Sequence, residues 1–290
     1  LVTTWKEDVP CVASSMRLLW FSHFIPYPPT GGAHQRSFNL LRSASKHYDI
    51  SLVAFNRHGE TSGDLAQYRA ELGRHCGTVE FWEMPTRWKS VRWWAKLALN
   101  AASPHPYTSS CFWSQDREKE WNCVLNQHRD ALVHFDSSDL ALYASTAKGF
   151  RKVLNHHNCE SAMAARRAHQ ESNAIKKVYL ESQARKMAQL ERAVCPLFNV
   201  NITVSELDAM LLKQNCPGVQ CRVVENGTDA EYFTPEPGPE EPNTVIFAGS
   251  LDWYPNVAAI RFFLEKVWPF VKRDIPAARF YVAGRHPGAA

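Results

Sequence analysis

The sequence predicts an α/β protein of two units, each a parallel β-sheet wrapped by helices. Apolar runs of strand length alternate with longer helical patterns along almost the whole chain, which is typical of parallel sheets. A chain of 290 residues is also too long for one small domain. The stretch "TPEPGPEEPN" (234–243) holds four prolines and three glutamates with nothing to bury, so it is predicted to link the units.

The first unit is predicted over residues 16–233, with seven strands. Each is a short apolar run that ends near a polar or turn residue, as "RLLWFS" does. After the first strand, a helix over 33–47 places Phe38, Leu40 and Leu41 on one side. One long helix is predicted over 160–194, which is rich in Ala, Glu, Arg and Lys and lacks Gly and Pro. The strands are predicted at 17–22, 50–55, 78–84, 130–136, 151–156, 199–205 and 221–226.

The second unit is predicted over 244–290 and starts the same pattern again. A strand at 244–250 leads through a glycine loop to a helix at 256–274, and a strand follows at 278–284. Because the chain ends there, only the opening of this unit is expected. The chain starts at Leu1 while Met16 opens a clean strand, so residues 1–15 are expected to be a disordered or non-native lead-in.

The composition excludes several classes of protein. With 45% apolar and 21% charged residues, the chain can bury a core and is not disordered. A net charge of +4 falls short of a nucleic-acid-binding signature. None of the eight cysteines forms a C-x-x-C pair, so we expect reduced thiols, no metal site and a cytoplasmic location. No apolar run reaches the length of a transmembrane helix.

The stretch "YPPTGGAHQR" (27–36) joins the first strand to the first helix. Gly31 and Gly32 would let a ligand approach the backbone, and the helix offers free N–H groups and its positive dipole end to an anion. The G-x-G-x-x-G of dinucleotide folds is absent, which argues against a nicotinamide-dependent oxidoreductase. A tight turn between strand and helix explains the two glycines equally well.

The stretch "VLNHHNCES" (153–161) places His156 and His157 beyond the end of a strand, where open α/β sheets bind ligands. Adjacent histidines point in different directions and no further ligand stands at zinc-type spacing, which argues against a metal. Two interpretations stay open. His157 is a general base or an orienting residue, or these are polar residues at a helix start, with Asn158 as N-cap and Glu160 in the first turn.

Three other stretches attract attention. "RVVENGTDAEYF" (222–233) ends a strand in Asn226-Gly227, where a hairpin is the alternative, although nothing strand-like follows. "FAGSLDWYPN" (247–256) repeats the strand–glycine-loop–helix design, so a ligand would lie in a cleft between the units if the loops face each other. Residues 86–107 mix basic residues and tryptophans, which suits either a helix at an anionic membrane surface or an ordinary packed helix.

Taken in order, "TGGAHQR", "HHNCES", "TVSELD", "VENGTDAEYF", "FAGSLDWYPN" and "FYVAG" resemble the GT-B glycosyltransferases of family 4, especially bacterial sugar transferases encoded with exopolysaccharide export systems. The resemblance runs from Met16 to the chain end, and "NGTDAEYF" is its most specific element. It implies two Rossmann-like, doubly wound parallel-sheet domains, the second incomplete. The first would hold a glycan or lipid-linked acceptor and the second a nucleotide sugar.

The resemblance further implies a hexosyl-type transferase for surface or exopolysaccharide synthesis, which acts with retention and without cofactor or metal on a nucleotide-diphosphate sugar. It places His157 at the reaction centre. We expect a cytoplasmic protein with peripheral membrane contact through 86–107. The residues expected to bind the donor or its phosphates are Gly31, Gly32, Arg36, Asn226, Gly227, Gly249 and Ser250, and those expected to shape the acceptor side are Asn158, Glu160 and Ser205.

Two departures from the family leave a second function open. The loop "GSLDWYPN" (249–256) lacks the arginine and lysine with which many members neutralise the departing diphosphate, unless Arg285 substitutes. The chain also ends before the family's donor-binding Glu-x7-Glu pair, so residues 1–290 alone are not expected to turn over substrate. A non-catalytic GT-B-like binding module is therefore the alternative.

Overall fold

The computed structural model describes residues 16–85, 95, 97, 99–230, 233–234, 238–251 and 253–285. The chain divides into two compact units, the first ending at Gly227 and the second starting at Thr228. The predictions for residues 1–15 and for the tryptophans of 86–94 lie outside the described residues.

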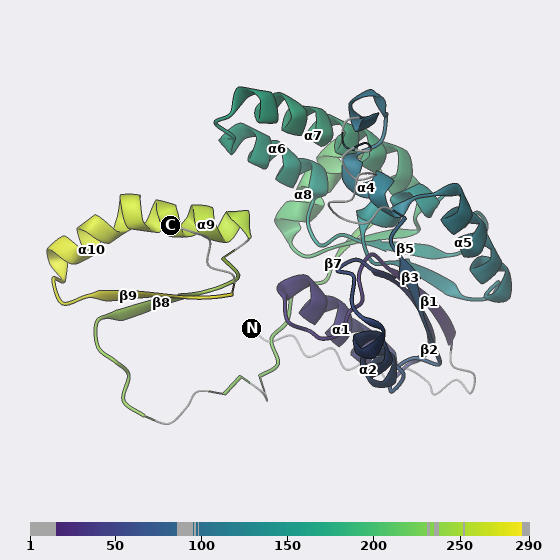
Figure 1. Cartoon of the computed structure of the whole chain (residues 1–290), viewed down its shortest axis with the longest axis horizontal. Helices are drawn as coiled ribbons and strands as arrows, with labels where there is room; N and C mark the ends of the chain where they lie inside the picture. The colour runs from purple at the N-terminus through teal and green to yellow at the C-terminus, as the bar shows by residue number, and fades with distance from the viewer. Residues whose placement is uncertain are drawn as a thin grey trace. The chain divides into compact units, whose positions relative to one another are not determined.

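Unit 1 is built on seven parallel strands in the order β3-β2-β1-β4-β5-β6-β7 (Figure 1). The chain moves outward from β1 to β3 and then returns to the other side of β1 with β4, which is the winding of a Rossmann-like sheet. Leu18 of β1 lies beside Ile50 of β2 and Leu132 of β4. The predicted α/β class with a doubly wound parallel sheet is therefore confirmed for unit 1. The strands are β1 Met16–Ser22, β2 Tyr48–Asn56, β3 Thr78–Glu83, β4 Leu132–Phe135, β5 Lys152–Asn155, β6 Val200–Thr203 and β7 Cys221–Val223.

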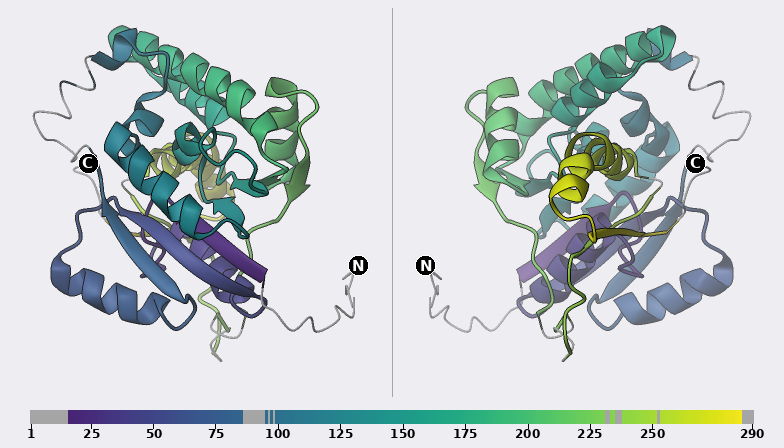
Figure 2. Two further views of the ribbon diagram at one scale, coloured as in Figure 1. Left: turned by 90° about the vertical axis from the view of Figure 1, so that its right-hand side faces the viewer. Right: turned by 90° about the vertical axis from the view of Figure 1, so that its left-hand side faces the viewer.

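The helices of unit 1 cover the sheet on both faces (Figure 2). Among the described residues, none of the helices is long and apolar enough to cross a membrane. The helices are α1 Gly32–Ala44, α2 Ser62–Leu72, α4 Tyr107–Phe112, α5 Gln115–Gln127, α6 Glu160–Gln170, α7 Ala174–Val194 and α8 Glu206–Asn215.

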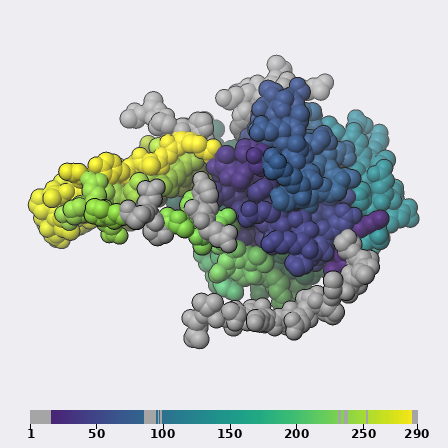
Figure 3. Space-filling model, turned by 90° about the horizontal axis from the view of Figure 1, so that it is seen from below, coloured from purple at the N-terminus to yellow at the C-terminus, as the bar shows by residue number. Residues whose placement is uncertain are grey.

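Each face of the sheet has its own hydrophobic core. Because side chains alternate along a strand, Leu18 and Trp20 of β1 enter one core and Leu19 and Phe21 enter the other. The first core is closed by α1 and α2, which lie next to each other on the surface (Figure 3). The second is closed by α5, α7 and α8.

The prediction of one helix over 160–194 was wrong, because this stretch forms two helices. Helix α6 ends at Gln170 and Glu171 adopts an extended conformation. The side chain of Asn173 then accepts a hydrogen bond from Lys176 N at 3.1 Å and starts α7. Residue propensity favours helix throughout, but this N-cap begins a new helix that lies side by side with α6 (Figure 1).

Unit 2 contains one β–α–β crossover. Strand β8 (Thr244–Ala248) pairs in parallel with β9 (Arg279–Ala283). The connection runs from α9 (Tyr254–Phe262) through a π-helical turn (Phe263–Val267) into α10 (Trp268–Asp274). The predicted helix over 256–274 is therefore present, with a π-helical turn inside it.

Candidate functional site

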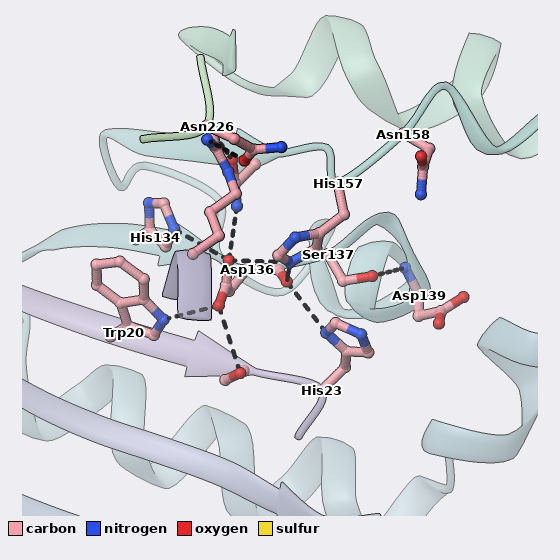
Figure 4. A network of polar contacts seen from close by, with 12 residues as sticks. Trp20, His23, His134, Asp136, Ser137, Asp139, His157, Asn158 and Asn226 are labelled. Carbon is pink, nitrogen blue, oxygen red and sulfur yellow. Dashed lines mark hydrogen bonds and ion pairs between the residues drawn. The ribbon is translucent and has the colours of Figure 1, made fainter. Parts of the chain in front are cut away.

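The carboxyl ends of β1 and β4 form the topological switch point of unit 1. The crossovers that follow these two neighbouring strands lead away in opposite directions, and open α/β sheets bind ligands at such a point. Polar residues gather there: His23 follows β1, Asp136 follows β4, and His157 follows β5. We define the candidate site by these three residues and their partners (Figure 4).

Asp136 is the centre of the site and its side chain is fully buried. Its Oδ2 atom accepts a hydrogen bond from Trp20 Nε1 at 3.2 Å and lies 3.5 Å from Ser22 Oγ. Its Oδ1 atom accepts from Asn155 Nδ2 at 2.7 Å. Donors from β1 and β5 therefore hold both carboxylate oxygens, which satisfies a buried polar group.

Two histidine rings also face the Asp136 carboxylate. Oδ1 lies 3.4 Å from His157 Nε2 and 3.7 Å from His134 Nε2. Burial by itself raises the pKa of Asp136, but His134 and His157 outweigh burial and hold that pKa well below its usual value. Asp136 is therefore a buried anion at neutral pH.

His157 is held by Asp136 in a defined tautomer. Its Nε2 lies 3.1 Å from the Asp136 backbone oxygen, which can only accept, so Nε2 carries a hydrogen. Burial disfavours the imidazolium, yet the Asp136 carboxylate overcomes this effect and raises the pKa of His157. No group in the described part of the chain bonds to Nδ1. When the ring is protonated, Nδ1 therefore presents a second N–H donor.

His23 bonds to the same carbonyl oxygen but has the opposite character. Its Nδ1 lies 3.1 Å from the Asp136 backbone oxygen and must be the protonated nitrogen. Burial, Arg57 and His157 together hold the pKa of His23 well below its usual value, so the ring is neutral. Its Nε2 is left with a lone pair and has no bonding partner among the described residues. The ring centroids of His23 and His157 are 5.6 Å apart, so a hydrogen-bond donor and a proton acceptor stand side by side.

Arg36 belongs to the site but is turned inward. It is buried on α1, where Nη2 lies 3.4 Å from Asn155 Oδ1. Nη1 donates to Asn226 Oδ1 at 3.0 Å and to the Glu225 backbone oxygen at 3.2 Å. Arg36 therefore ties the Asn226-Gly227 segment to the carboxyl edge of the sheet. The structure describes no strand pairing with β7 after this segment, so Asn226-Gly227 is not a hairpin turn.

The glycine pair stands at the start of α1. Gly31 is the N-cap residue with φ −136°, and no side chain caps the helix there. Gly32 is exposed, and a Cβ atom built on it would meet nothing within 4 Å. Gly31 does not adopt a left-handed conformation, and protein packing does not require glycine at position 32. The uncapped first-turn N–H groups and the open space above them suit an anionic ligand.

The loop after β5 differs from its prediction. Cys159, not Asn158, is the N-cap residue of α6, and Asp208 Oδ1 accepts from Cys159 N at 3.0 Å. Asn158 Nδ2 instead lies 3.5 Å from Glu160 Oε1. Burial and the nearby carboxylate of Asp139 raise the pKa of Glu160 to about 7. Glu160 therefore exchanges a proton near neutral pH, whereas the sequence predicted a place in the first turn and a part in shaping the acceptor side.

Ser205 and His156 make further contacts around the loop after β5. Ser205 is the N-cap residue of α8, and its Oγ donates to Asp208 Oδ2 at 2.5 Å, which links it to the loop through Asp208. His156 is buried with Nε2 3.1 Å from Asn201 Oδ1, and burial lowers its pKa to about 4. The adjacent histidines thus make separate contacts. No three His, Cys, Asp or Glu side chains of the described residues are grouped as metal ligands.

Gly249 and Ser250 lie in unit 2 at the end of β8. A Cβ atom on Gly249 would stand 2.8 Å from Asn256 Nδ2, so a larger residue there would displace the Asn256 side chain. Asn256 Nδ2 donates to the Ser250 backbone oxygen at 2.9 Å and shapes this loop.

The structure thus brings together His157, Arg36 and Asn226 from the predicted set, with Asn158 in the adjoining loop and Glu160 at the start of α6. Sequence reasoning missed Asp136, His23 and Asn155. The signal that could have found them is position, because each ends or directly follows a strand of the sheet.

No protein-family model matches the chain, and no curated protein matches it. Among solved structures, it is similar to the Medicago truncatula protein UGT71G1 complexed with UDP-glucose, with 11% identity and a TM-score of 0.48 over 94% of this chain and 72% of that one. It is also similar to the N-terminal domain of Candida albicans trehalose-6-phosphate phosphatase, with 11% identity and a TM-score of 0.49 over 98% of this chain and 75% of that one. A third similar structure is a UDP-glucose: anthocyanidin 3-O-glucosyltransferase in complex with UDP, with 11% identity and a TM-score of 0.44 over 94% of this chain and 73% of that one. Likeness at this level assigns no chemistry, and the fold class rests on the strand order.

Proposed function

We propose that the protein is a GT-B glycosyltransferase of family 4 type, which transfers a hexose from a nucleoside-diphosphate sugar to a glycan or lipid-linked acceptor in surface polysaccharide synthesis. The reaction takes place in the cytoplasm at the membrane and uses neither cofactor nor metal. The observation that carries the proposal is the Asp136–His157 pair at the switch point of a doubly wound sheet. The resemblance of "TGGAHQR", "HHNCES" and "NGTDAEYF" to that family supports it.

The site offers what sugar transfer needs. The bond between the anomeric carbon and the diphosphate breaks, and negative charge develops on the leaving diphosphate. The Nδ1–H of His157, when this ring is protonated, and the backbone N–H groups at the start of α1 can stabilise that charge or hold a sugar hydroxyl. In transfer with retention, the acceptor oxygen bonds to the anomeric carbon and its proton passes to the leaving phosphate oxygen. The protein then acts by positioning and charge stabilisation.

His157→Ala tests this function in the protein encoded by the full reading frame. Transfer from radiolabelled UDP- and GDP-hexoses is measured together with nucleotide binding by calorimetry. We expect kcat to fall about 10²- to 10³-fold, the loss typical of a removed charge-stabilising donor, while nucleotide binding changes little. The matched control is His169→Ala, an exposed histidine on α6, which should keep full activity.

A non-catalytic binding module is the second candidate. The loop over 249–256 carries no lysine or arginine, and Asn256 holds its backbone from within unit 2. If the wild-type protein binds a UDP- or GDP-hexose but transfers none, and His157→Ala keeps the ligand, the binding module replaces the enzyme. If it transfers hexose and His157→Ala abolishes this, the binding module is excluded.

His23 tests the stereochemical part of the proposal. Inversion needs a base for the proton of the acceptor hydroxyl, and neutral His23 offers the lone pair of its Nε2 for that role. Under retention, His23→Gln should lower kcat less than about tenfold, and proton NMR should show the donor's anomeric configuration in the product. A loss of about 100-fold or more together with an inverted product would overturn retention.

A further inference from the structure

The most exposed large apolar side chains of unit 1, among the described residues, lie on α7 and on the segment that α7 holds. Ile175 is 84% exposed, Leu99 73% and Val178 64%. Ile175 and Val178 are three residues apart, so they share one face of the helix. On soluble proteins, the most exposed apolar side chains rarely lie together unless a partner covers them.

Helix α7 consists of two different halves. Its buried residues all lie from Ala184 onward, where Met187, Leu190 and Val194 enter the core of unit 1. None of residues 174–183 is buried. The second half therefore fixes the helix to the fold, and the first half presents Ile175 and Val178 to the surroundings.

The same helix fixes the segment that contains Leu99. Gln183 Nε2 donates to Asn100 Oδ1 at 2.8 Å, and Lys186 Nζ donates to the Asn100 backbone oxygen at 2.5 Å. Gln183 follows Val178 by five residues, or about 8 Å along the helix axis. Leu99, next to Asn100, is thereby held near the exposed half of α7.

This half of α7 is also positively charged. Residues 174–183 contain two lysines and one glutamate, a surplus of one, and Arg185 follows at the start of the second half. Lys176 and Lys177 stand between Ile175 and Val178. Helix α8 carries an exposed apolar pair with the same spacing, Leu207 and Met210, but Glu206 and Asp208 flank it. Positive charge therefore distinguishes the α7 pair from a similar apolar pair elsewhere.

We propose that the first half of α7, with Ile175, Lys176, Lys177 and Val178, docks the protein on an anionic lipid bilayer, with Leu99 as an additional contact. Apolar side chains enter the boundary between headgroups and acyl chains, and lysines contact the anionic headgroups. The apolar pair therefore suits the boundary with the acyl chains, and the two lysines suit the anionic headgroups. Docking assigns a surface of unit 1 to the membrane location in the proposed function, but it does not depend on sugar transfer.

The test is co-sedimentation of the full chain with phosphatidylcholine vesicles, with and without about one third phosphatidylglycerol. We expect binding to the anionic vesicles, a strong decrease with added salt, and little binding to neutral vesicles. Ile175→Ser/Val178→Ser should lower the partition coefficient at least about tenfold. Lys176→Gln/Lys177→Gln should lower it about fivefold for each lysine. The matched control, Leu207→Ser/Met210→Ser, should bind like the wild type.

Absence of binding to anionic vesicles would overturn the proposal and leave a protein partner as the explanation of the exposed pair. Wild-type binding by both α7 variants would overturn it as well. Far-UV circular dichroism verifies that each variant is folded. Because no nucleotide sugar is present, this experiment can fail while the transferase activity stands, and the reverse.

Discussion

Replacement of Asp136 by asparagine tests whether this carboxylate organises the site. Trp20 Nε1 donates to one oxygen, and Asn155 Nδ2 donates to the other. The Asn155 amide cannot exchange the positions of its oxygen and nitrogen without losing a contact, because its Oδ1 faces Arg36 Nη2 at 3.4 Å. Asparagine offers one oxygen and one NH2 group, so in either orientation its NH2 group meets another donor.

The expected cost follows from these contacts. At least one buried donor is left unpaired, which costs about 1–3 kcal/mol. The charge that compensates His157 is also lost, and removal of one partner of a buried ion pair costs about 3–5 kcal/mol. The two costs overlap, because the second already includes the buried partner left behind, so we expect Asp136→Asn to lower the free energy of unfolding by about 3–5 kcal/mol. The control is Asp130→Asn, whose exposed carboxylate pairs with Arg17 at 3.3 Å and should cost about 0–1 kcal/mol.

The loss should also depend on pH. The folded pKa of His157 is raised, so its contribution to stability is fully present below the unfolded pKa of about 6.5 and is lost as the pH rises through the folded pKa. The pKa of Asp136 is lowered, so this group is ionised in both states above about pH 5 and adds no slope there. The difference between wild type and Asp136→Asn should therefore be larger at about pH 5.5 than at about pH 8.5.

Urea unfolding followed by circular dichroism at the two pH values measures the loss of unfolding free energy and its dependence on pH. A loss below about 1 kcal/mol would mean that Asp136 behaves like a surface carboxylate. An equal loss at both pH values would mean that His157 does not depend on the carboxylate for its proton. Either result would refute the electrostatic account of the site.

Two further changes separate ligand binding from stability. Gly32→Ala should leave the melting temperature unchanged or slightly higher, because a Cβ there meets nothing within 4 Å, and should weaken nucleotide-sugar binding in calorimetry; unchanged affinity would remove Gly32 from the phosphate site. Gly284→Ala is its contrast, since a Cβ there would lie 1.8 Å from Gly249 O, and it should destabilise unit 2. Arg36→Lys should speed amide hydrogen exchange over 224–227, because one ammonium cannot reproduce contacts to both Asn155 and Asn226; exchange at the wild-type rate would show that Arg36 does not hold this segment.

Local patterns in the sequence determined the elements of the sheet. The apolar runs at 17–22 and 50–55 became β1 and β2 with small shifts at their ends, because a strand buried on both faces needs a continuous apolar run. The mixed run at 78–84 became β3 at the edge of the sheet. Helices α2, α5 and α8 were not foreseen. Much of their surface is polar and exposed, so they carry little of the periodic apolar signal that identifies a helix.

The chemistry at the switch point depended on contacts between distant residues. In sequence, Asp136 is only the last residue of "DALVHFD". It becomes the centre of the site because β4 returns beside β1 and places it 113 residues along the chain from His23. The same packing turned Arg36 inward to Asn155 and Asn226, although the sequence suggested a ligand contact.

The sequence by itself determined the α/β class and the strand positions, because hydrophobic periodicity and turn residues act over short distances along the chain, and it placed His157 beyond the end of a strand. Only the tertiary structure decided the protonation of His157 and His23 and the central place of Asp136. Burial and charge pairing fix a proton, and both depend on which strands become neighbours.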